Sequence, residues 1–421
     1  MRRLGVSSGD RVAAFLPNGP EAIIGMLATT SLGAIWSSCS PDFGAASVID
    51  RFGQIAPKVL IATGGYQYAG KTIRTQDTVR ALSARLAGLV AVVDAGPPEF
   101  RLDELHSPDD VTRTKVLSWQ ALTSESAPLE FVATPFDHPV YILYSSGTTG
   151  LPKGIVHGAG GILLQHLKEH LLHVDLHRDD RLFYFTTCGW MMWNWLVSGL
   201  AAGATLVLYD GSPTWPDEDA LWRLTDELGI TVFGTSARYL ASVARRATSP
   251  RDMHSLASIR SILSTGSPLA PETFDTVYER IKPDLQLASI SGGTDICGCF
   301  VLGNPLLPVR RGEIQCAALG MAVDIYDSDG QSLPAGRGEL VCIRPFPSQP
   351  VAFWADPQGE KYRKAYFARF PGVWAHGDFA ERTSSGGYII HERSDAVLNP
   401  GGVPDRYGGT LPCGSADAGD R

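Results

Sequence analysis

Up to residue 310 this chain alternates short β-branched runs with segments of helical periodicity. Val12–Leu16 ends at a turn rich in proline and glycine, and a helical pattern follows over Glu21–Leu32. Ala220–Leu228 repeats the helical pattern, stops before a glycine, and is followed by the apolar run Ile230–Phe233. This alternation predicts an α/β fold with parallel sheets covered by helices, in which ligands bind at the carboxyl ends of the strands.

The pattern changes in the last quarter of the chain. Ala322–Tyr326 and Gly338–Ile343 are extended runs on either side of a turn, which is typical of antiparallel strands. We therefore expect an α/β domain over residues 1–310, a small β-rich subdomain over 311–391, and a disordered tail within 392–421. The tail contains many glycine, proline and aspartate residues and no periodic apolar face.

Composition narrows the class of protein. The 421 residues, 44% apolar and 19% charged, are ordinary for a globular enzyme with more than one structural unit. A net charge of −8 without a basic tract argues against nucleic acid as a partner. The apolar runs are much shorter than the roughly 20 residues that span a bilayer, and no secretory apolar segment follows Met1. We expect a cytoplasmic protein without a membrane partner.

A loop rich in glycine and hydroxyl groups directly follows the apolar run Val140–Tyr144. The loop consists of Ser145, Ser146, Gly147, Thr148, Thr149, Gly150, Leu151, Pro152, Lys153 and Gly154. Its glycines let backbone N–H groups approach phosphate oxygens, its hydroxyls donate hydrogen bonds, and Lys153 supplies positive charge. A Walker A loop is excluded because glycine follows the lysine. A plain surface loop is the alternative, but the proline that fixes the backbone before Lys153 argues against it.

Four further segments place glycine, hydroxyl and charged groups near predicted strands. They are Ser264-Thr265-Gly266-Ser267-Pro268, Ser291-Gly292-Gly293-Thr294-Asp295, Trp374-Ala375-His376-Gly377-Asp378 and Glu392-Arg393-Ser394-Asp395. Taken singly, each segment is also explained by a turn or by an exposed ion pair. They become informative only when they are taken together with the loop, in the order in which all five follow one another along the chain.

In this order, the loop and the four segments resemble the signature of the adenylate-forming superfamily, which includes acyl-CoA synthetases, luciferases and peptide-synthetase adenylation domains. Within it the chain is most similar to the acetoacetate–CoA ligase branch. The resemblance runs from about Val6 to Val403. It implies a large adenylate-forming N-terminal domain, with ATP, Mg²⁺ and coenzyme A as cofactors or co-substrates and a small carboxylic acid as substrate.

The resemblance also implies a role for each matching residue. Thr148, Lys153, Thr294 and Asp295 are the expected catalytic residues. Asp295 is also the expected magnesium ligand, since aspartate remains a hard oxygen donor although the family usually has glutamate there. The expected nucleotide-binding residues are Ser145, Ser146, Gly147, Thr149, Gly150, Gly266, Ser267, Pro268, Asp378 and Arg393. Among them, Asp378 would accept hydrogen bonds from the ribose hydroxyls.

The acid is expected beside the aromatic segment Thr187–Trp193, in a pocket formed with Gly189, Trp190, Thr265 and Gly292. A related enzyme closes this pocket with a tryptophan where this chain has Gly292. Glycine would therefore admit a longer acid such as acetoacetate, because such pockets discriminate by about 1–3 kcal/mol per methylene. The alternative is that most of the aromatic segment is core.

The implied reaction joins acetoacetate to coenzyme A through an acyl-adenylate, with release of pyrophosphate and AMP. After Val403 the chain departs from the family pattern, so we expect that residues 392–421 hold a hinge remnant and an unrelated tail. We likewise expect a chain shortened at both ends, without the family's C-terminal domain and its lysine. Two alternatives remain open: another adenylating enzyme with a different acid or acceptor, and an ATP-binding remnant without turnover.

Overall fold

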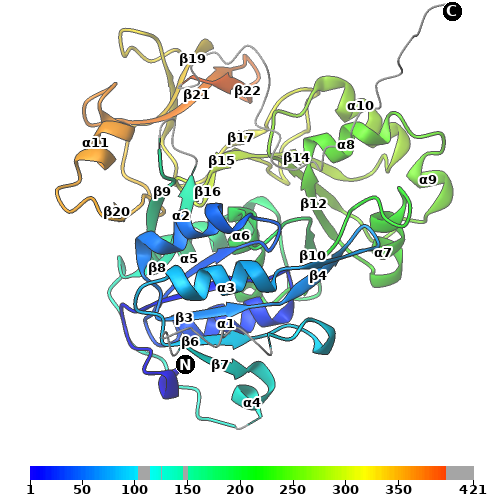
Figure 1. Ribbon diagram of the computed structural model, residues 1–421. Helices are drawn as coiled ribbons and strands as arrows, with labels where there is room; N and C mark the ends of the chain where they lie inside the picture. Colours follow the sequence, from blue (N-terminus) through cyan, green and yellow to red (C-terminus); the bar gives the residue numbers. More distant parts are fainter. Residues whose placement is uncertain (103–113, 125, 146–149, 395–421) are drawn as a thin grey trace, which may run out of the picture.

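Two large β-sheets carry most of the described chain, which comprises residues 1–102, 114–124, 126–145 and 150–394 of a computed structural model (Figure 1). The first sheet has eight strands in the order β20-β9-β8-β2-β1-β3-β6-β7. Its strands are β1 (Arg11–Phe15), β2 (Ile35–Cys39), β3 (Val59–Ala62), β6 (Ala91–Asp94), β7 (Lys115–Ser118), β8 (Pro139–Ser145), β9 (Lys153–Gly158) and β20 (Ala352–Phe353). The six strands from β8 to β7 are parallel, whereas β9 runs antiparallel to both of its neighbours.

The second sheet is entirely parallel, as the alternation of strands and helices predicts. Its five strands follow the order β11-β10-β12-β13-β14. They are β10 (Arg181–Tyr184), β11 (Thr205–Val207), β12 (Val232–Ser236), β13 (Ser261–Thr265) and β14 (Gln286–Ser289). The sheet is buried on both faces, because successive residues of β10 alternate between two different apolar clusters.

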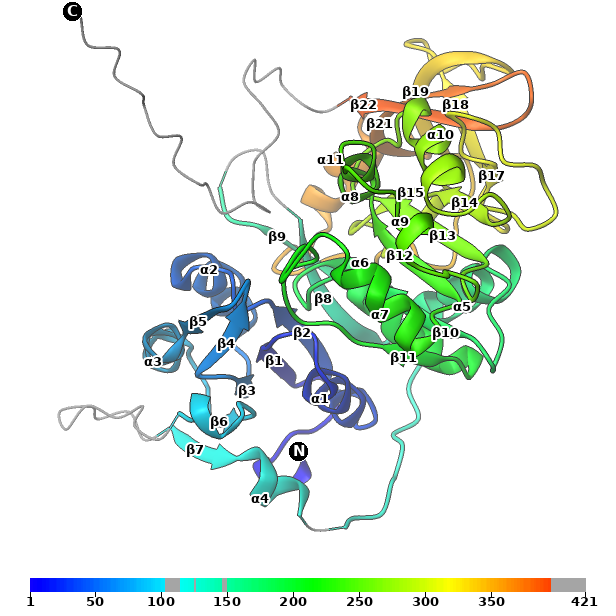
Figure 2. The ribbon, with the colours of Figure 1, turned by 90° about the vertical axis from the view of Figure 1, so that its right-hand side faces the viewer.

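Helices form three layers around these two sheets. The α-helices are α1 (Pro20–Thr30), α2 (Ala45–Ile55), α3 (Gln76–Arg85), α4 (Trp119–Thr123), α5 (Ala159–Lys168), α6 (Met191–Ser198), α7 (Ala220–Leu228), α8 (Ala237–Val243), α9 (Pro250–Met253), α10 (Pro271–Arg280) and α11 (Glu360–Phe367). Short 3₁₀ turns span Arg2–Leu4, Pro98–Phe100 and Gly199–Ala202, and a π-helical turn spans Glu169–His173. Helices α2 and α3 cover one face of the first sheet, and α1 packs on the other face (Figure 2). Helices α5 and α6 share the core between the two sheets, and α7, α8 and α10 cover the far face of the second sheet.

Local sequence explains where several of these helices begin and end. Helix α7 has the predicted bounds and stops at Gly229, whose left-handed φ of 60° suits a residue without a side chain. Helix α10 begins at Pro271, a residue favoured in the first turn. The side chain of Ser236 caps α8 by accepting a hydrogen bond from the backbone N–H of Tyr239 at 3.2 Å.

Three smaller antiparallel sheets complete the described chain. The first is a hairpin of β4 (Gly65–Tyr68) and β5 (Lys71–Arg74). The second has three strands, β15 (Ser291–Gly293), β16 (Gly298–Leu302) and β17 (Cys316–Ala317). The third has four strands, β18 (Val323–Tyr326), β19 (Gly336–Cys342), β21 (Trp374–Arg382) and β22 (Tyr388–Arg393). Two strand pairings cross the expected boundary at residue 310, since β17 pairs with β16 and β20 pairs with β9. The division into 1–310, 311–391 and 392–421 stays a prediction, and residues 395–421 lie outside the described residues.

A buried carboxylate fastens the three-stranded sheet to the helical core. Glu169 in the π-helical turn accepts hydrogen bonds from the indole N–H of Trp195 at 2.8 Å, the backbone N–H of Cys299 at 2.8 Å and the side-chain amide of Gln165 at 2.6 Å. His166 makes a second contact with the same sheet region: one of its ring nitrogens lies 2.6 Å from the carbonyl oxygen of Cys297. Both contacts hold the segment that directly follows Asp295.

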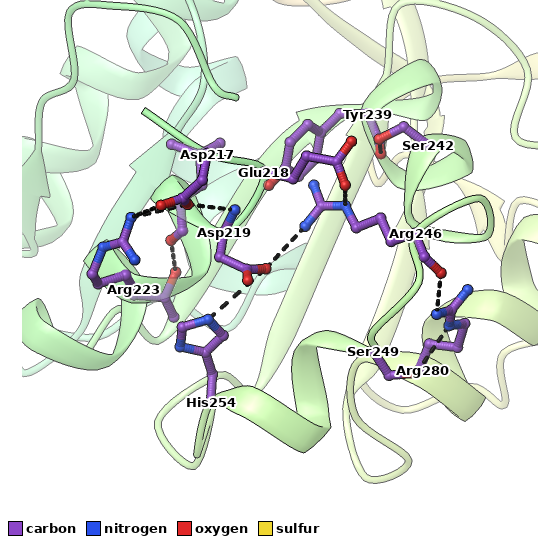
Figure 3. A network of polar contacts seen from close by, with 12 residues as sticks. Asp217, Glu218, Asp219, Arg223, Tyr239, Ser242, Arg246, Ser249, His254 and Arg280 are labelled. Atoms are coloured by element: carbon purple, nitrogen blue, oxygen red, sulfur yellow. Dashed lines mark hydrogen bonds and ion pairs between the residues drawn. The ribbon is translucent and has the colours of Figure 1, made fainter. Parts of the chain in front are cut away.

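A polar network joins the helices on the far side of the second sheet (Figure 3). Asp219 lies 3.3 Å from the guanidinium of Arg246, and Asp217 lies 2.9 Å from that of Arg223. Arg280 of α10 donates a 2.7 Å hydrogen bond to the carbonyl oxygen of Arg246. This network therefore ties α7, the end of α8 and α10 together. Within the described residues, no helix combines the length and the apolar character that a transmembrane span requires.

The contact between β12 and β10 predicts a stability difference between two glycine substitutions. A Cβ atom at Gly234 in β12 would lie 2.1 Å from Cδ2 of the fully buried Tyr184 ring, whereas a Cβ at Gly53 in α2 would meet nothing within 4 Å. We expect Gly234→Ala to lower the free energy of unfolding by about 1–3 kcal/mol because the core is overpacked. Gly53→Ala should leave it unchanged or raise it by up to about 1 kcal/mol. Urea unfolding measures both variants, and equal effects would contradict the packing described here.

Candidate functional site

Asp295 is contacted by side chains from two distant segments of the chain. The hydroxyl of Tyr366 in α11 donates a 2.5 Å hydrogen bond to its Oδ1. The ammonium Nζ of Lys153 in β9 lies 3.8 Å from the same oxygen. The Asp295 side chain is only 15% exposed, so these groups act on a largely desolvated carboxylate.

The electrostatic surroundings keep Asp295 ionised. Burial by itself would raise the pKa of this carboxyl. His376, Lys153, the hydroxyl of Tyr366 and Arg393 together outweigh burial, and they hold the pKa of Asp295 below its ordinary value. Asp295 is therefore an anion at neutral pH.

Asp378 lies beside the same group of residues. It pairs with Arg393 across β21 and β22, and the guanidinium Nη1 lies 3.4 Å from its Oδ1. Nε2 of His376 lies 3.7 Å from its other carboxylate oxygen. The Asp378 side chain is 8% exposed, whereas that of Arg393 is 47% exposed. The carboxyl group is thus buried, whereas the guanidinium is half-exposed.

The two ends of the predicted phosphate loop lie opposite each other. Ser145 at the end of β8 is in register with Lys153 at the start of β9. The Lys153 ammonium lies over the rings of Phe353 and Tyr366, at 5.2 and 5.7 Å from their centroids. Gly150 has a φ of 106°, a conformation that glycine adopts without strain. The remaining loop residues predicted to bind phosphate, Ser146, Gly147, Thr148 and Thr149, lie outside the described residues.

The residues Gly266, Ser267 and Pro268, which are predicted to bind the nucleotide, directly follow β13. Gly266 follows β13 with a φ of 89°, and a Cβ there would lie 4.0 Å from the Trp190 ring. The hydroxyl of Thr265 donates a 3.0 Å hydrogen bond to the carbonyl oxygen of Ile290, directly before the segment that leads to Asp295. Ser267 and Pro268 are exposed. The structure therefore brings Thr265, Gly266 and Trp190 together.

The two remaining pocket glycines are closely packed. A Cβ at Gly189 would lie 3.1 Å from the Phe43 ring. A Cβ at Gly292 would lie 1.9 Å from the carbonyl oxygen of Gly298 in the adjacent strand. The close approach of β15 and β16 thus requires a residue without a side chain at Gly292. The expectation that Gly292 also opens space for a longer acid stays a prediction. Most of the neighbouring aromatic segment is core, because Cys188, Met191, Met192 and Trp193 are buried.

Sequence reasoning missed two residues of this site. Tyr366 lies in α11, whose charged sequence Glu360–Phe367 resembles a surface helix and gives no sign that its tyrosine reaches Asp295. His376 lies inside the segment that predicted Asp378, but nothing in the sequence indicates a role for it.

Thr294 precedes Asp295 in a tight turn, in which the backbone N–H of Cys297 donates to the Thr294 carbonyl oxygen at 3.3 Å.

Residues 1–347 match the AMP-binding enzyme family. The chain belongs to this family. Acetoacetyl-coenzyme A synthetase of Rhizobium meliloti (strain 1021) is 57% identical over 403 residues, which cover 96% of this chain and 61% of that protein. Malonamoyl-CoA synthetase vrtB of Penicillium aethiopicum is 45% identical, over 97% of this chain and 57% of that protein.

A solved structure of an AMP-binding family relative has the same fold. The acetoacetyl-CoA synthetase from Streptomyces lividans aligns with a TM-score of 0.88 at 47% identity, over 95% of this chain and 61% of that one. The chain therefore spans about three fifths of the length of these relatives. Its α/β fold, with parallel and mixed sheets between helices, is that of the adenylate-forming N-terminal domain.

The donor set of this AMP-binding enzyme fits magnesium that arrives with a nucleotide. Among the described residues no three His, Cys, Asp or Glu side chains cluster closely enough to hold a metal by themselves. Mg²⁺ commonly takes one or two protein carboxylates and completes its coordination with substrate phosphates and water. Asp295 supplies one such ionised carboxylate, and its Tyr366 and Lys153 contacts both fall on Oδ1.

The position of Lys153 predicts a shift in the pKa of Asp295. Lys153→Met removes a cation that stabilises the carboxylate, so the pKa of Asp295 should rise toward its ordinary value. A lowered carboxyl pKa contributes stability at neutral pH that is lost as the pH falls through that pKa, and the variant should lose part of this contribution. Carbon NMR of protein with ¹³C-labelled aspartate, assigned with Asp295→Asn, measures the titration.

Lys58→Met is the matched control, because that ammonium lies 2.9 Å from Asp10. It should leave the titration of Asp295 unchanged. An Asp295 titration that is the same in the Lys153→Met variant and in the unmodified chain would contradict the arrangement of the site.

Proposed function

We propose that the chain is the nucleotide-binding and acid-activating part of an ATP-dependent acid–thiol ligase. The reaction converts acetoacetate, ATP and coenzyme A to acetoacetyl-CoA, AMP and pyrophosphate. The observation that carries the proposal is the convergence of Lys153, Asp295, Asp378 and Arg393, which come from three separate parts of the sequence. The acetoacetyl-CoA synthetases among the relatives support it.

Each of these residues has a chemical role in the proposed nucleotide complex. Asp378 is a buried acid that accepts hydrogen bonds from the ribose hydroxyls, and the half-exposed guanidinium of Arg393 lies beside it. Lys153 places positive charge at the end of the phosphate loop. Asp295 would hold Mg²⁺, which offsets negative charge on the phosphates when it is bound. The turn at Gly266 leaves room for a flat ring to approach the backbone.

The first half of the reaction forms an acyl-adenylate. A carboxylate oxygen of the acid bonds to the α-phosphorus of ATP, and the bond from that phosphorus to the bridging oxygen breaks as pyrophosphate leaves. The residues contribute by positioning the two anions in line and by offsetting their charge, so no covalent protein intermediate is needed. This agrees with the burial of Cys297 and Cys299, which raises the pKa of both thiols and disfavours the nucleophilic thiolate.

The second half of the reaction transfers the acyl group to coenzyme A. Its sulfur bonds to the activated carbonyl carbon, the carbon–oxygen bond to phosphate breaks, AMP leaves, and the thiol proton passes to solvent. Because the relatives are longer than this chain, the complete reaction is proposed for the whole protein. The described residues account for nucleotide binding and acid activation. A protein that binds ATP without turnover is the alternative for the chain by itself.

The substrate class follows from the names of two relatives. One is an acetoacetyl-CoA synthetase and the other a malonamoyl-CoA synthetase. Acetoacetate and malonamate have the same size, and both have a carbonyl group two bonds from the carboxylate carbon. We propose that the acid is a short 3-oxo acid of this shape and that it lies beside Gly189, Trp190 and Thr265. Malonamate is the second candidate substrate.

Nucleotide binding gives the first test of this function. Titration calorimetry should show that the chain binds ATP in the presence of Mg²⁺. Lys153→Ala should weaken ATP binding about 10- to 100-fold, the effect of losing one charge-assisted hydrogen bond, and should leave adenosine binding unchanged. Lys364→Ala removes an exposed lysine on α11 and should change neither affinity. Equal effects of the two substitutions would contradict the role of Lys153.

Acid specificity gives the second test. Exchange of labelled pyrophosphate into ATP reports the first half-reaction without coenzyme A. Acetoacetate should support exchange, and malonamate should support it more weakly or equally. Acetate and butyrate lack the 3-carbonyl, and each should be at least about tenfold poorer, as expected where a polar group of the substrate is recognised. Exchange that depends on acetate as strongly as on acetoacetate would contradict the substrate proposal.

A further inference from the structure

His376 is a buried imidazole that lies next to Asp378 and against the turn that contains Asp295. Its side chain is 1% exposed. Nε2 lies 3.7 Å from Oδ2 of Asp378. The same ring lies against the turn that contains Asp295, because a Cβ at Gly293 would lie 3.5 Å from Nε2 and 3.9 Å from the backbone nitrogen of Asp295.

Both ring nitrogens of His376 are unsatisfied. Neither has a hydrogen-bond partner within the described parts of the chain. A buried polar group without a partner costs about 1–3 kcal/mol, so the position of His376 requires an explanation. The ring cannot turn away from the site, since Phe300 packs edge-on against it at a centroid distance of 4.7 Å.

His376 affects Asp295 electrostatically and lies close to Asp378. It is the strongest of the neighbouring groups that lower the pKa of Asp295. It also approaches Asp378 on the oxygen opposite to the one that Arg393 contacts. One imidazole is therefore shared by the carboxylate proposed for Mg²⁺ and the carboxylate proposed for ribose.

We propose that His376 is a positioning residue that couples recognition of the ribose to binding of Mg²⁺. This inference rests on the proposed nucleotide site. In the free protein Nε2 lies beyond hydrogen-bond distance from Asp378, at 3.7 Å, and the ring lies against the turn that contains Asp295. When Mg²⁺ offsets the charge of Asp295, the ring N–H donates to Asp378 alone. Asp378 is then fixed with its other oxygen directed to the ribose hydroxyls.

The competing explanation is that His376 only fills space against Phe300. Filling space predicts that a shape-conserving apolar side chain serves as well as imidazole. Coupling predicts that a donor near the position of Nε2 is required. Glutamine can place its amide N–H there, whereas leucine has similar bulk and no donor. The two variants therefore separate the explanations.

The test measures four dissociation constants by titration calorimetry on the full chain. ATP and 2′,3′-dideoxy-ATP are each titrated with Mg²⁺ and with EDTA. For each nucleotide, the experiment gives the factor by which Mg²⁺ lowers the dissociation constant. In the unmodified chain, the ratio of the factor for ATP to the factor for the dideoxy analogue should be about five or more. His376→Leu should reduce this ratio of effects to about one, and His376→Gln should retain most of it.

A matched control comes from the adjacent strand. His391 in β22 lies 3.2 Å from Glu381, and His391→Gln should leave the ratio unchanged. A ratio of about one in the unmodified chain, or a ratio that survives His376→Leu, would overturn the coupling and leave the nucleotide site intact. The ratio in the unmodified chain decides the question even where the leucine variant does not fold. Failure of the unmodified chain to bind ATP would instead overturn the proposed function, and the coupling with it.

Discussion

The contact of Asp295 with Lys153 and Tyr366 is the interaction on which the site depends. Lys153 belongs to the first sheet, Asp295 follows a strand of the three-stranded sheet, and Tyr366 belongs to the helix that packs beside the four-stranded sheet. This carboxyl group, which is 15% exposed, is ionised because His376, Lys153, Tyr366 and Arg393 together outweigh the effect of burial on its pKa. The same contact holds three parts of the chain at one place, and this makes a nucleotide site possible.

Behind this contact the core leaves the segment around Asp295 little freedom. Glu169 and His166 hold the backbone at Cys299 and Cys297. The carbonyl oxygen of Gly298 approaches Gly292 so closely that a Cβ would lie 1.9 Å away. The turn that presents Asp295 is therefore fixed on both sides by buried groups. Such rigidity reduces the reorganisation that binding and catalysis require.

Much of the fold follows from the sequence, because its signals are local. Helix α7 and its glycine stop come from apolar spacing and from one backbone conformation. The parallel second sheet comes from the alternation of strands and helices. Contacts between distant residues leave no such signal. Two-residue β20 joins β9 across a long sequence separation, and Tyr366 reaches Asp295 from a charged helix. Both depend on tertiary packing and not on local propensity.

In the candidate site, too, some features could be predicted from the sequence, whereas those that depend on tertiary packing could not. The resemblance to the adenylate-forming superfamily implies that Lys153, Asp295, Asp378 and Arg393 belong together. In the structure Lys153 lies near Asp295, Arg393 lies near Asp378, and Arg393 also lowers the pKa of Asp295. The reason for Gly292 could not be predicted, because the position of the adjacent strand decides it. The role of His376 could not be predicted either, since it depends on Asp295 and Asp378, which only the fold brings near this histidine.

The most direct measurement is a crystal structure of the chain with Mg²⁺ and ATP. The account predicts a metal about 2.1 Å from a carboxylate oxygen of Asp295, with the ribose hydroxyls on Asp378 and the phosphates beside Lys153. A nucleotide bound in another cleft, or a metal held without Asp295, would contradict it.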